Sequence, residues 1–183
     1  MTLLRQLFAG HWFYMVYFQE PGVADADLGR DVATTMRRLL AGTTREPGAA
    51  ADPEAAADDG RGFVERFPEP TALPAWLTAA DVDHYVAEFA RTGFTGGLNW
   101  YRNLDRNWEL TPQFDGAKVT VPSLFIGGRL DPVLTMSPAE TMDGWLTDHR
   151  GTVLVEGAGH WVQQEKPAEV NTALTDFLAG LHL

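Results

Sequence analysis

Two short apolar runs stand out in the second half of the chain, and each is followed by glycine and then by one ionisable residue. Residues 121–126 lead to Asp131, and residues 152–155 lead to His160. Unbroken apolar runs of this length, rich in Val, Leu and Ile, are typical of strands buried on both faces of a parallel sheet. Between them, Ser137-Pro-Ala-Glu140 carries the signals of a helix start: an N-cap serine, a proline at the first helical position and a glutamate three residues after the cap. The pattern predicts a strand–helix–strand unit.

Helical periodicity fills most of the first 110 residues. It predicts an amphipathic helix over about 24–40 that ends at Gly42, a second from the capping box Thr78-Ala-Ala-Asp81 to Gly93, and a short third after Gly97 with Trp108 just beyond it. Residues 1–22 are dense in aromatic side chains, and we interpret them as buried structure. Residues 42–74 are predicted to be a long loop, and Pro167 to open a last helix. The predicted order is therefore helices, followed by β-α-β-α.

Two parallel strands do not form a stable sheet by themselves. No other segment of the chain has a convincing strand pattern, so we expect further strands upstream of Met1 and interpret the chain as truncated. The run 121–126 would otherwise present an unpaired apolar edge, and we expect self-association through that edge.

Charge and composition narrow the class of protein. With 183 residues and a net charge of −11, the chain would be repelled by nucleic acid and by anionic membranes, so neither is expected as a partner. The apolar run near the amino terminus is too short and too interrupted to span a bilayer. The chain has no cysteine, which fits a cytoplasmic protein and excludes thiolate zinc sites. The other histidines lack partners at ligand spacing, so no metal is predicted.

Asp131 and His160 are the candidate catalytic pair. Each lies just past the carboxyl end of a predicted strand, where open α/β sheets gather their catalytic groups. An aspartate placed there can fix the imidazole tautomer and stabilise its charged form. Taken singly, Asp131 before proline could be a turn former and His160 a core residue; the pairing favours catalysis.

The chain resembles the soluble epoxide hydrolases of the α/β-hydrolase superfamily. The resemblance rests on Tyr17-Phe-Gln-Glu-Pro-Gly22, Gly97-Leu-Asn-Trp-Tyr101-Arg-Asn, the turn Gly128-Arg-Leu-Asp131 and Gly159-His160-Trp161. It implies an α/β-hydrolase fold in truncated form. Residues 1–112 would be the end of the upstream core region and a helical cap, and 113–183 the carboxyl-terminal part of the core.

The resemblance also implies a reaction, the addition of water to an epoxide to give a vicinal diol without a cofactor. A carboxylate nucleophile would form an ester with the substrate, and His160, oriented by Asp131, would activate the water that hydrolyses it. Tyr17 and Tyr101 would donate hydrogen bonds or a proton to the epoxide oxygen. Trp100, Trp161 and Phe18 are candidate pocket residues, whereas Tyr14 and Tyr85 look like core packing.

The chain departs from the family pattern in one respect. It has no strand–turn–helix with a nucleophile and no His-Gly-x-Pro oxyanion motif, so we expect it to be inactive alone. Two alternatives stay open. One is another α/β hydrolase: a dehalogenase would hold a halide with Trp or Asn donors, and an esterase would need an upstream serine. The other is a non-catalytic fragment that binds a partner or a hydrophobic ligand.

Overall fold

The computed structural model describes residues 1–43 and 57–181, which divide into two compact units. The first comprises Met1–Gly42 and 57–112, and the second comprises Thr43 and 113–181. No helix in these ranges is long and apolar enough to cross a membrane.

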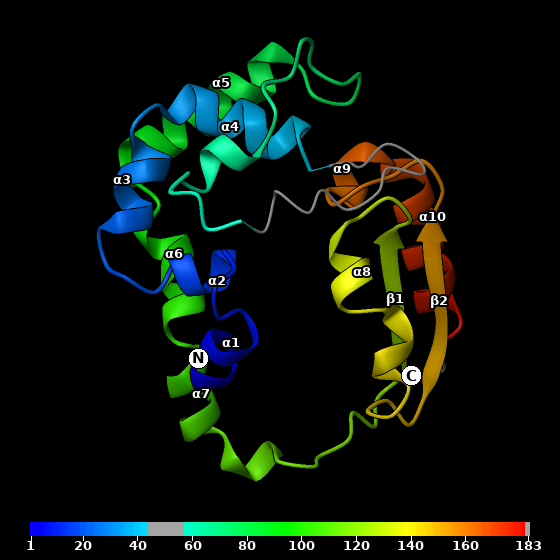
Figure 1. Cartoon of the computed structure of the whole chain (residues 1–183). Coiled ribbons are helices and arrows are strands. Elements are labelled where there is room, and N and C mark those ends of the chain that lie inside the picture. The colour runs from blue at the N-terminus through cyan, green and yellow to red at the C-terminus, as the bar shows by residue number, and fades with distance from the viewer. Residues whose placement is uncertain (44–56, 182–183) are drawn as a thin grey trace. The chain divides into compact units, whose positions relative to one another are not determined.

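The first unit is helical (Figure 1). Its α-helices are α1 (Thr2–Leu7), α2 (Tyr14–Tyr17), α3 (Val23–Gly29), α4 (Val32–Ala41), α5 (Ala79–Thr92), α6 (Thr95–Arg102) and α7 (Leu104–Leu110), with a 3₁₀ turn at Val64–Arg66. Helix α4 packs against α5, and α3 against α4 and α6. The buried apolar side chains include Phe18, Leu28, Met36, Leu40, Val64, Val82 and Leu98. The apolar faces predicted from the sequence thus form a real core.

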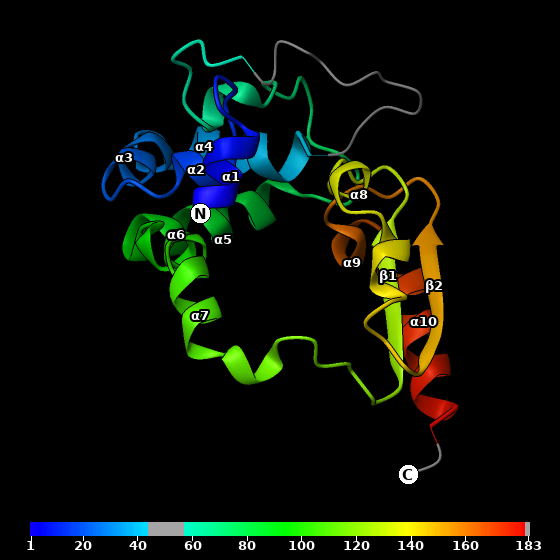
Figure 2. The same ribbon diagram turned by 60° about the horizontal axis from the view of Figure 1, so that its bottom comes forward.

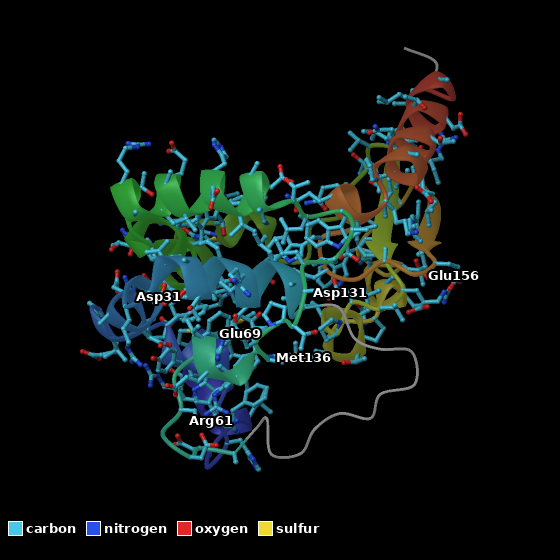
Figure 3. All side chains as sticks on the ribbon, turned by 90° about the horizontal axis from the view of Figure 1, so that it is seen from above. Asp31, Arg61, Glu69, Asp131, Met136 and Glu156 are labelled. Carbon is cyan, nitrogen blue, oxygen red and sulfur yellow. The ribbon has the colours of Figure 1, made fainter. Side chains whose placement is uncertain are left out.

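The helix predicted over 24–40 is two helices, so that prediction was wrong. Helix α3 ends at Gly29, and Asp31 (labelled in Figure 3) begins α4 by accepting a hydrogen bond from the Thr34 amide at 3.1 Å. The apolar periodicity continues across the break because both helices present it to the same core. The capping box at Thr78 is confirmed, since the Asp81 carboxylate accepts from the Thr78 amide at 2.9 Å. Trp108, predicted beyond the third helix, lies within α7.

The second unit contains a parallel pair of strands, β1 (Ser123–Gly128) and β2 (His149–Val155), in the register Ile126 to Val153. A 3₁₀ turn at Pro112–Phe114 precedes them. Helix α10 (Pro167–Ala179) packs against both strands, and the short α9 (Val162–Glu165) packs against α10 (Figure 2). The predicted parallel pairing and last helix are confirmed. The strands are not buried on both faces, however, because within the described residues only Gly127, Gly128 and Val155 of the two strands are buried.

The helix predicted to begin at Ser137 is absent, so this prediction was also wrong. Ser137 instead ends α8 (Val133–Met136), donating its amide to the Val133 carbonyl at 2.9 Å. Only a 3₁₀ turn, Ala139–Met142, follows. The proline and glutamate signals are present, but the serine side chain makes no cap hydrogen bond there.

Candidate active site

The loops that follow β1 and β2 touch each other at the carboxyl ends of the strands. The Leu130 amide donates to the Ala158 carbonyl at 2.8 Å, and the Arg129 amide donates to the Val155 carbonyl at 3.1 Å. A Cβ atom on Gly128 would lie 2.0 Å from the Gly159 carbonyl oxygen, so the approach requires a residue without a side chain. The two strand ends are thereby held close enough for their side chains to meet.

Asp131 and His160 do meet at this point. The Nδ1 atom of His160 lies 3.0 Å from Oδ2 of Asp131, as expected from the sequence. The other carboxylate oxygen of Asp131 accepts from the Val133 amide at 2.8 Å, which fixes the carboxylate in a turn. With Nδ1 donating to the carboxylate, Nε2 is the nitrogen left to act as a base. The side chain of His160 is 38% exposed and that of Asp131 is 14% exposed, so the base can be reached while its partner is largely covered.

A cavity of about 360 Å³ borders the pair. Its walls are mainly apolar and come from β1, from α8 with the turn after it, and from the loop after β2 with the start of α9; they include Phe125, Ile126, Leu134, Met142 and Val162. An apolar space beside one titratable pair is typical of a small-molecule site. Within the described residues, no group of three or more His, Cys, Asp or Glu side chains is arranged to hold a metal ion.

In the first unit, the two tyrosine-bearing motifs interlock. Gln19 donates from Nε2 to the Tyr101 carbonyl at 3.1 Å, and Arg102 donates from Nε to the Phe18 carbonyl at 2.9 Å. The rings of Phe18 and Tyr101 meet edge to face with centroids 5.1 Å apart. Side chains of each motif therefore hold the backbone of the other, which joins α2 to α6.

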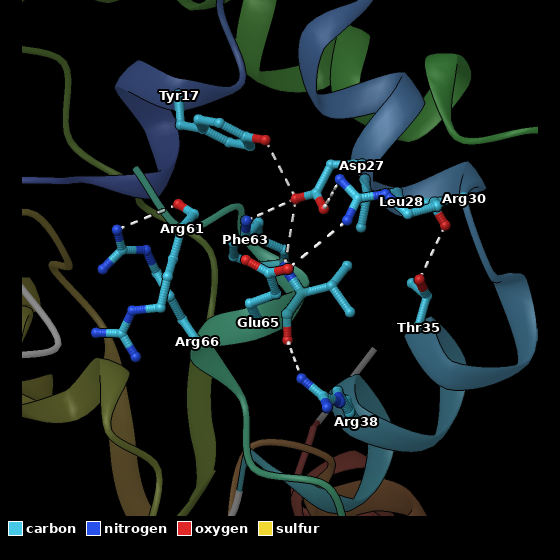
Figure 4. Close-up of polar contacts among 11 residues, drawn as sticks. Tyr17, Asp27, Leu28, Arg30, Thr35, Arg38, Arg61, Phe63, Glu65 and Arg66 are labelled. Atoms are coloured by element: carbon cyan, nitrogen blue, oxygen red, sulfur yellow. Dashed lines mark hydrogen bonds and ion pairs between the residues drawn. The ribbon is translucent and has the colours of Figure 1, made fainter. Parts of the chain in front are cut away.

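Tyr17 is held by a buried carboxylate. Its hydroxyl donates to Oδ2 of Asp27 at 3.1 Å, and the same oxygen accepts from the Phe63 amide at 2.6 Å (Figure 4). Burial, with the charge and hydrogen bond of Asp27 in second place, raises the pKa of Tyr17 to about 12. The phenol is thus protonated at neutral pH, but its proton is directed at Asp27.

Tyr14 lies beside Tyr101, although the sequence pattern predicted Tyr14 to be a core residue. The two rings meet edge to face at 5.8 Å, and Tyr14 also contacts Phe18 at 5.6 Å. Burial first, and then the neighbouring Tyr101, raise the pKa of Tyr14 to about 12. Among the described residues no hydrogen-bond partner is found for its hydroxyl. The four-residue spacing of Tyr14 and Phe18 predicts contact between their two rings, but it does not predict the contact of Tyr14 with Tyr101.

The predicted pocket residues lie in different surroundings. Phe18 is buried in the aromatic cluster and Trp100 is 78% exposed on α6. Trp161 meets the His160 ring edge to face, with centroids 4.9 Å apart.

Proteins of similar sequence are epoxide hydrolases, although no protein-family model matches the chain. Epoxide hydrolase A of Mycobacterium tuberculosis is 52% identical over 183 residues, covering 98% of this chain and 56% of the relative. Epoxide hydrolase 1 of Siraitia grosvenorii is 41% identical over 94% of this chain and 54% of its own length. The chain thus spans about half the length of these relatives.

Solved structures of similar fold carry the same name. Epoxide hydrolase A from Mycobacterium thermoresistibile is 54% identical, with a TM-score of 0.89 over 100% of this chain and 57% of that one. Potato epoxide hydrolase I is 32% identical, with a TM-score of 0.78 over 98% of this chain and 56% of that one. Sequence and fold agree: over nearly its whole length the chain is homologous to epoxide hydrolases of the α/β-hydrolase fold.

Proposed function

We propose that the protein is an epoxide hydrolase, or the carboxyl-terminal portion of one, which adds water to an epoxide to give a vicinal diol without a cofactor. One observation carries the proposal: Asp131 and His160 form a hydrogen-bonded pair where two parallel strands end, beside an apolar cavity. The names of the relatives support the choice of an epoxide as the substrate.

His160 acts as the general base in this proposal. Hydrolysis of an alkyl-enzyme ester requires a water molecule to lose a proton as it attacks the carbonyl carbon. Nε2 of His160 takes that proton, and the Asp131 carboxylate stabilises the imidazolium that results. Residues 1–183 contain no nucleophile motif that could supply the ester-forming carboxylate, so we expect these residues alone to turn over no epoxide. We also expect them to self-associate through the open edge of the strand pair.

Two phenols supply the acid in the ring-opening step. An epoxide oxygen becomes an alkoxide as its C–O bond breaks, and a neutral donor in a water-poor site stabilises it without the cost of burying a cation. The sequence favours Tyr17 and Tyr101. The contacts within the first unit favour Tyr14 in place of Tyr17, because Tyr14 lies against Tyr101 whereas Tyr17 would have to leave Asp27 before it could donate to a substrate. We therefore assign the acids as Tyr101 and Tyr14.

The two parts of the chain have separate tasks in this proposal. Residues 1–112 supply the cap with the tyrosines, and 113–183 supply the base and its aspartate. Phe18, Trp100 and Trp161 remain candidates for contact with the substrate. A cytoplasmic location is also part of the proposal and rests on the absence of cysteine.

The test is diol formation by the full-length protein. We expect His160→Gln to abolish turnover and the double variant Tyr14→Phe/Tyr101→Phe to lose it as well. Tyr17→Phe should retain most activity, and Tyr85→Phe on α5 serves as the matched control. Full activity in the Tyr14/Tyr101 double variant would overturn the acid assignment, and loss in Tyr17→Phe with retention in Tyr14→Phe would restore Tyr17.

Other substrates discriminate the alternatives. Halide release from haloalkanes without diol formation would identify a dehalogenase, and ester cleavage through a serine would identify an esterase. Binding of a hydrophobic ligand without turnover of any of these substrates would favour the non-catalytic interpretation.

A further inference from the structure

The carboxylate of Glu165 spans the two backbone N–H groups on either side of His160. Its Oε2 accepts from the Gly159 amide at 2.7 Å, and its Oε1 accepts from the Trp161 amide at 3.0 Å. Each oxygen thus holds one peptide of the segment 159–161. Hydrogen bonds to an ionised acceptor are stronger than those between neutral groups, and two of them on one rigid carboxylate fix orientation as well as distance.

Helix α9 brings Glu165 to this position. Its last residue, Glu165, donates its own amide to the Trp161 carbonyl at 2.9 Å, and the Gln164 amide donates to the same oxygen at 2.8 Å. The backbone and the side chain of Glu165 therefore bind the same peptide segment from one helical turn. The loop that carries His160 is closed onto α9 by contacts that do not involve the imidazole itself.

The imidazole has few other constraints on its position. It contacts the Trp161 ring and the Asp131 carboxylate, and 38% of the His160 side chain is exposed. Its Nδ1 reaches Oδ2 of Asp131 only if the peptide of residue 160 is correctly oriented. Asp131 is itself fixed by the Val133 amide at 2.8 Å, so the two partners are supported from separate elements. A hydrogen bond between them depends on both supports.

From this geometry we infer that Glu165 is a positioning residue for His160, which it acts on through the Gly159 and Trp161 amides. The inference rests on the proposed function only where it concerns turnover; the orientation of the imidazole is measurable without it. Glu165 is not a catalytic residue in this scheme, since it reaches His160 only through the backbone.

The test is ¹⁵N NMR of the His160 imidazole in the full-length protein. In the parent protein we expect one tautomer of His160, with the proton on Nδ1 facing Asp131. Glu165→Ala should give a mixture of both tautomers. Glu165→Gln keeps one acceptor oxygen but turns an NH₂ toward the second amide, so its effect should be intermediate. Glu169→Ala, on the exposed first turn of α10, is the matched control and should leave the tautomer unchanged.

Turnover provides a second readout. A misplaced catalytic group typically costs up to roughly 10²-fold in rate, so we expect Glu165→Ala to lower kcat by about that factor without raising KM. A single, unchanged tautomer in Glu165→Ala, with Asp131→Asn altering it, would overturn the inference. If Glu165→Ala does not fold, the same comparison with Glu165→Gln decides. If the parent protein hydrolyses no epoxide but Glu165→Ala still gives a mixture of both tautomers, the proposed function is refuted and the positioning role of Glu165 stands.

Discussion

The hydroxyl of Tyr17 donates a hydrogen bond to the buried carboxylate of Asp27 at 3.1 Å. Asp27 also accepts from the amides of Phe63 and Val64, at 2.6 and 3.4 Å, and lies 3.8 Å from a nitrogen of Arg30. Figure 4 shows these groups converging on one carboxylate from α2, α3 and the turn at Val64–Arg66. Asp27 therefore joins α2 and α3 to the turn at Val64–Arg66, which is distant from both in sequence.

Replacing Asp27 with asparagine should lower the pKa of Tyr17 from about 12 toward its ordinary value. Burial remains in the variant, but the negative charge that disfavours the phenolate is removed. A spectrophotometric titration of phenolate absorbance measures the change, with Tyr17→Phe identifying the transition. We also expect a loss of about 1–3 kcal/mol in the free energy of unfolding, because backbone amides lose a charged acceptor. Asp83→Asn, exposed on α5, should change neither quantity.

Gly128→Ala should separate the two loops that carry Asp131 and His160. The added methyl group would meet the Gly159 and Ala158 carbonyl oxygens at 2.0 and 2.5 Å, and both are backbone atoms that cannot turn aside. We expect a cost of about 1–3 kcal/mol in the free energy of unfolding, together with lost activity. Gly144→Ala is the control, since a Cβ there meets nothing within 4 Å. Equal thermal stability of the two variants would contradict the close approach.

The ion pair between Arg102 and Asp25 should make stability depend on acid pH. Hydrogen bonds from Arg102 and then Thr95 lower the pKa of Asp25 to about 2. Since the folded-state pKa is depressed, this contribution is present above the ordinary carboxyl pKa near 3.8 and is lost as pH falls toward 2. Arg102→Gln should therefore reduce stability at pH 5 and much less at pH 2, measured by denaturant unfolding.

The matched control for that variant is Arg106→Gln, which removes an exposed pair with Glu109 on α7. Exposed pairs of this kind contribute little to stability, so its unfolding should follow the parent protein at both pH values. A loss of stability at pH 5 as large as that of Arg102→Gln would show that the effect does not depend on the pair between Arg102 and Asp25.

Asp131→Asn should slow turnover by roughly 10²- to 10⁴-fold while leaving the fold intact. The asparagine amide keeps the size of the carboxylate, yet it no longer stabilises a charged imidazole or enforces one tautomer. Steady-state kinetics of diol formation, with circular dichroism to confirm folding, measure the effect. Unchanged kcat would remove Asp131 from the mechanism.

The sequence was sufficient to place Asp131 and His160 together because parallel strands align their carboxyl ends, so two residues at equivalent ends must be neighbours. It was insufficient at Ser137. This residue carries helix-start signals, but its backbone amide binds the Val133 carbonyl and ends α8. The sequence also did not predict that Asp31 divides the helix expected over 24–40 into two. Both errors concern the residue at which one helix ends, and the apolar periodicity does not identify that residue.

The choice between Tyr14 and Tyr17 shows a different limit. Both tyrosines lie in the aromatic segment 1–22, and the motif at 17–22 favoured Tyr17 as the acid. Only the fold brings Asp27, ten residues later, to the Tyr17 hydroxyl and places the Tyr14 ring against Tyr101. Which phenol is available depends on contacts between helices, and no spacing rule within α2 gives them.

Asp131 and His160 are both contributed by the continuous segment from β1 to the turn after β2. In the proposed mechanism, the water-activating half of the chemistry is therefore encoded in about one-fifth of the chain, as a unit in which the base and the aspartate that orients it lie together. We therefore expect that exchanging the residues around this unit would change which bond is attacked first, whereas the intermediate would still be released by the same base.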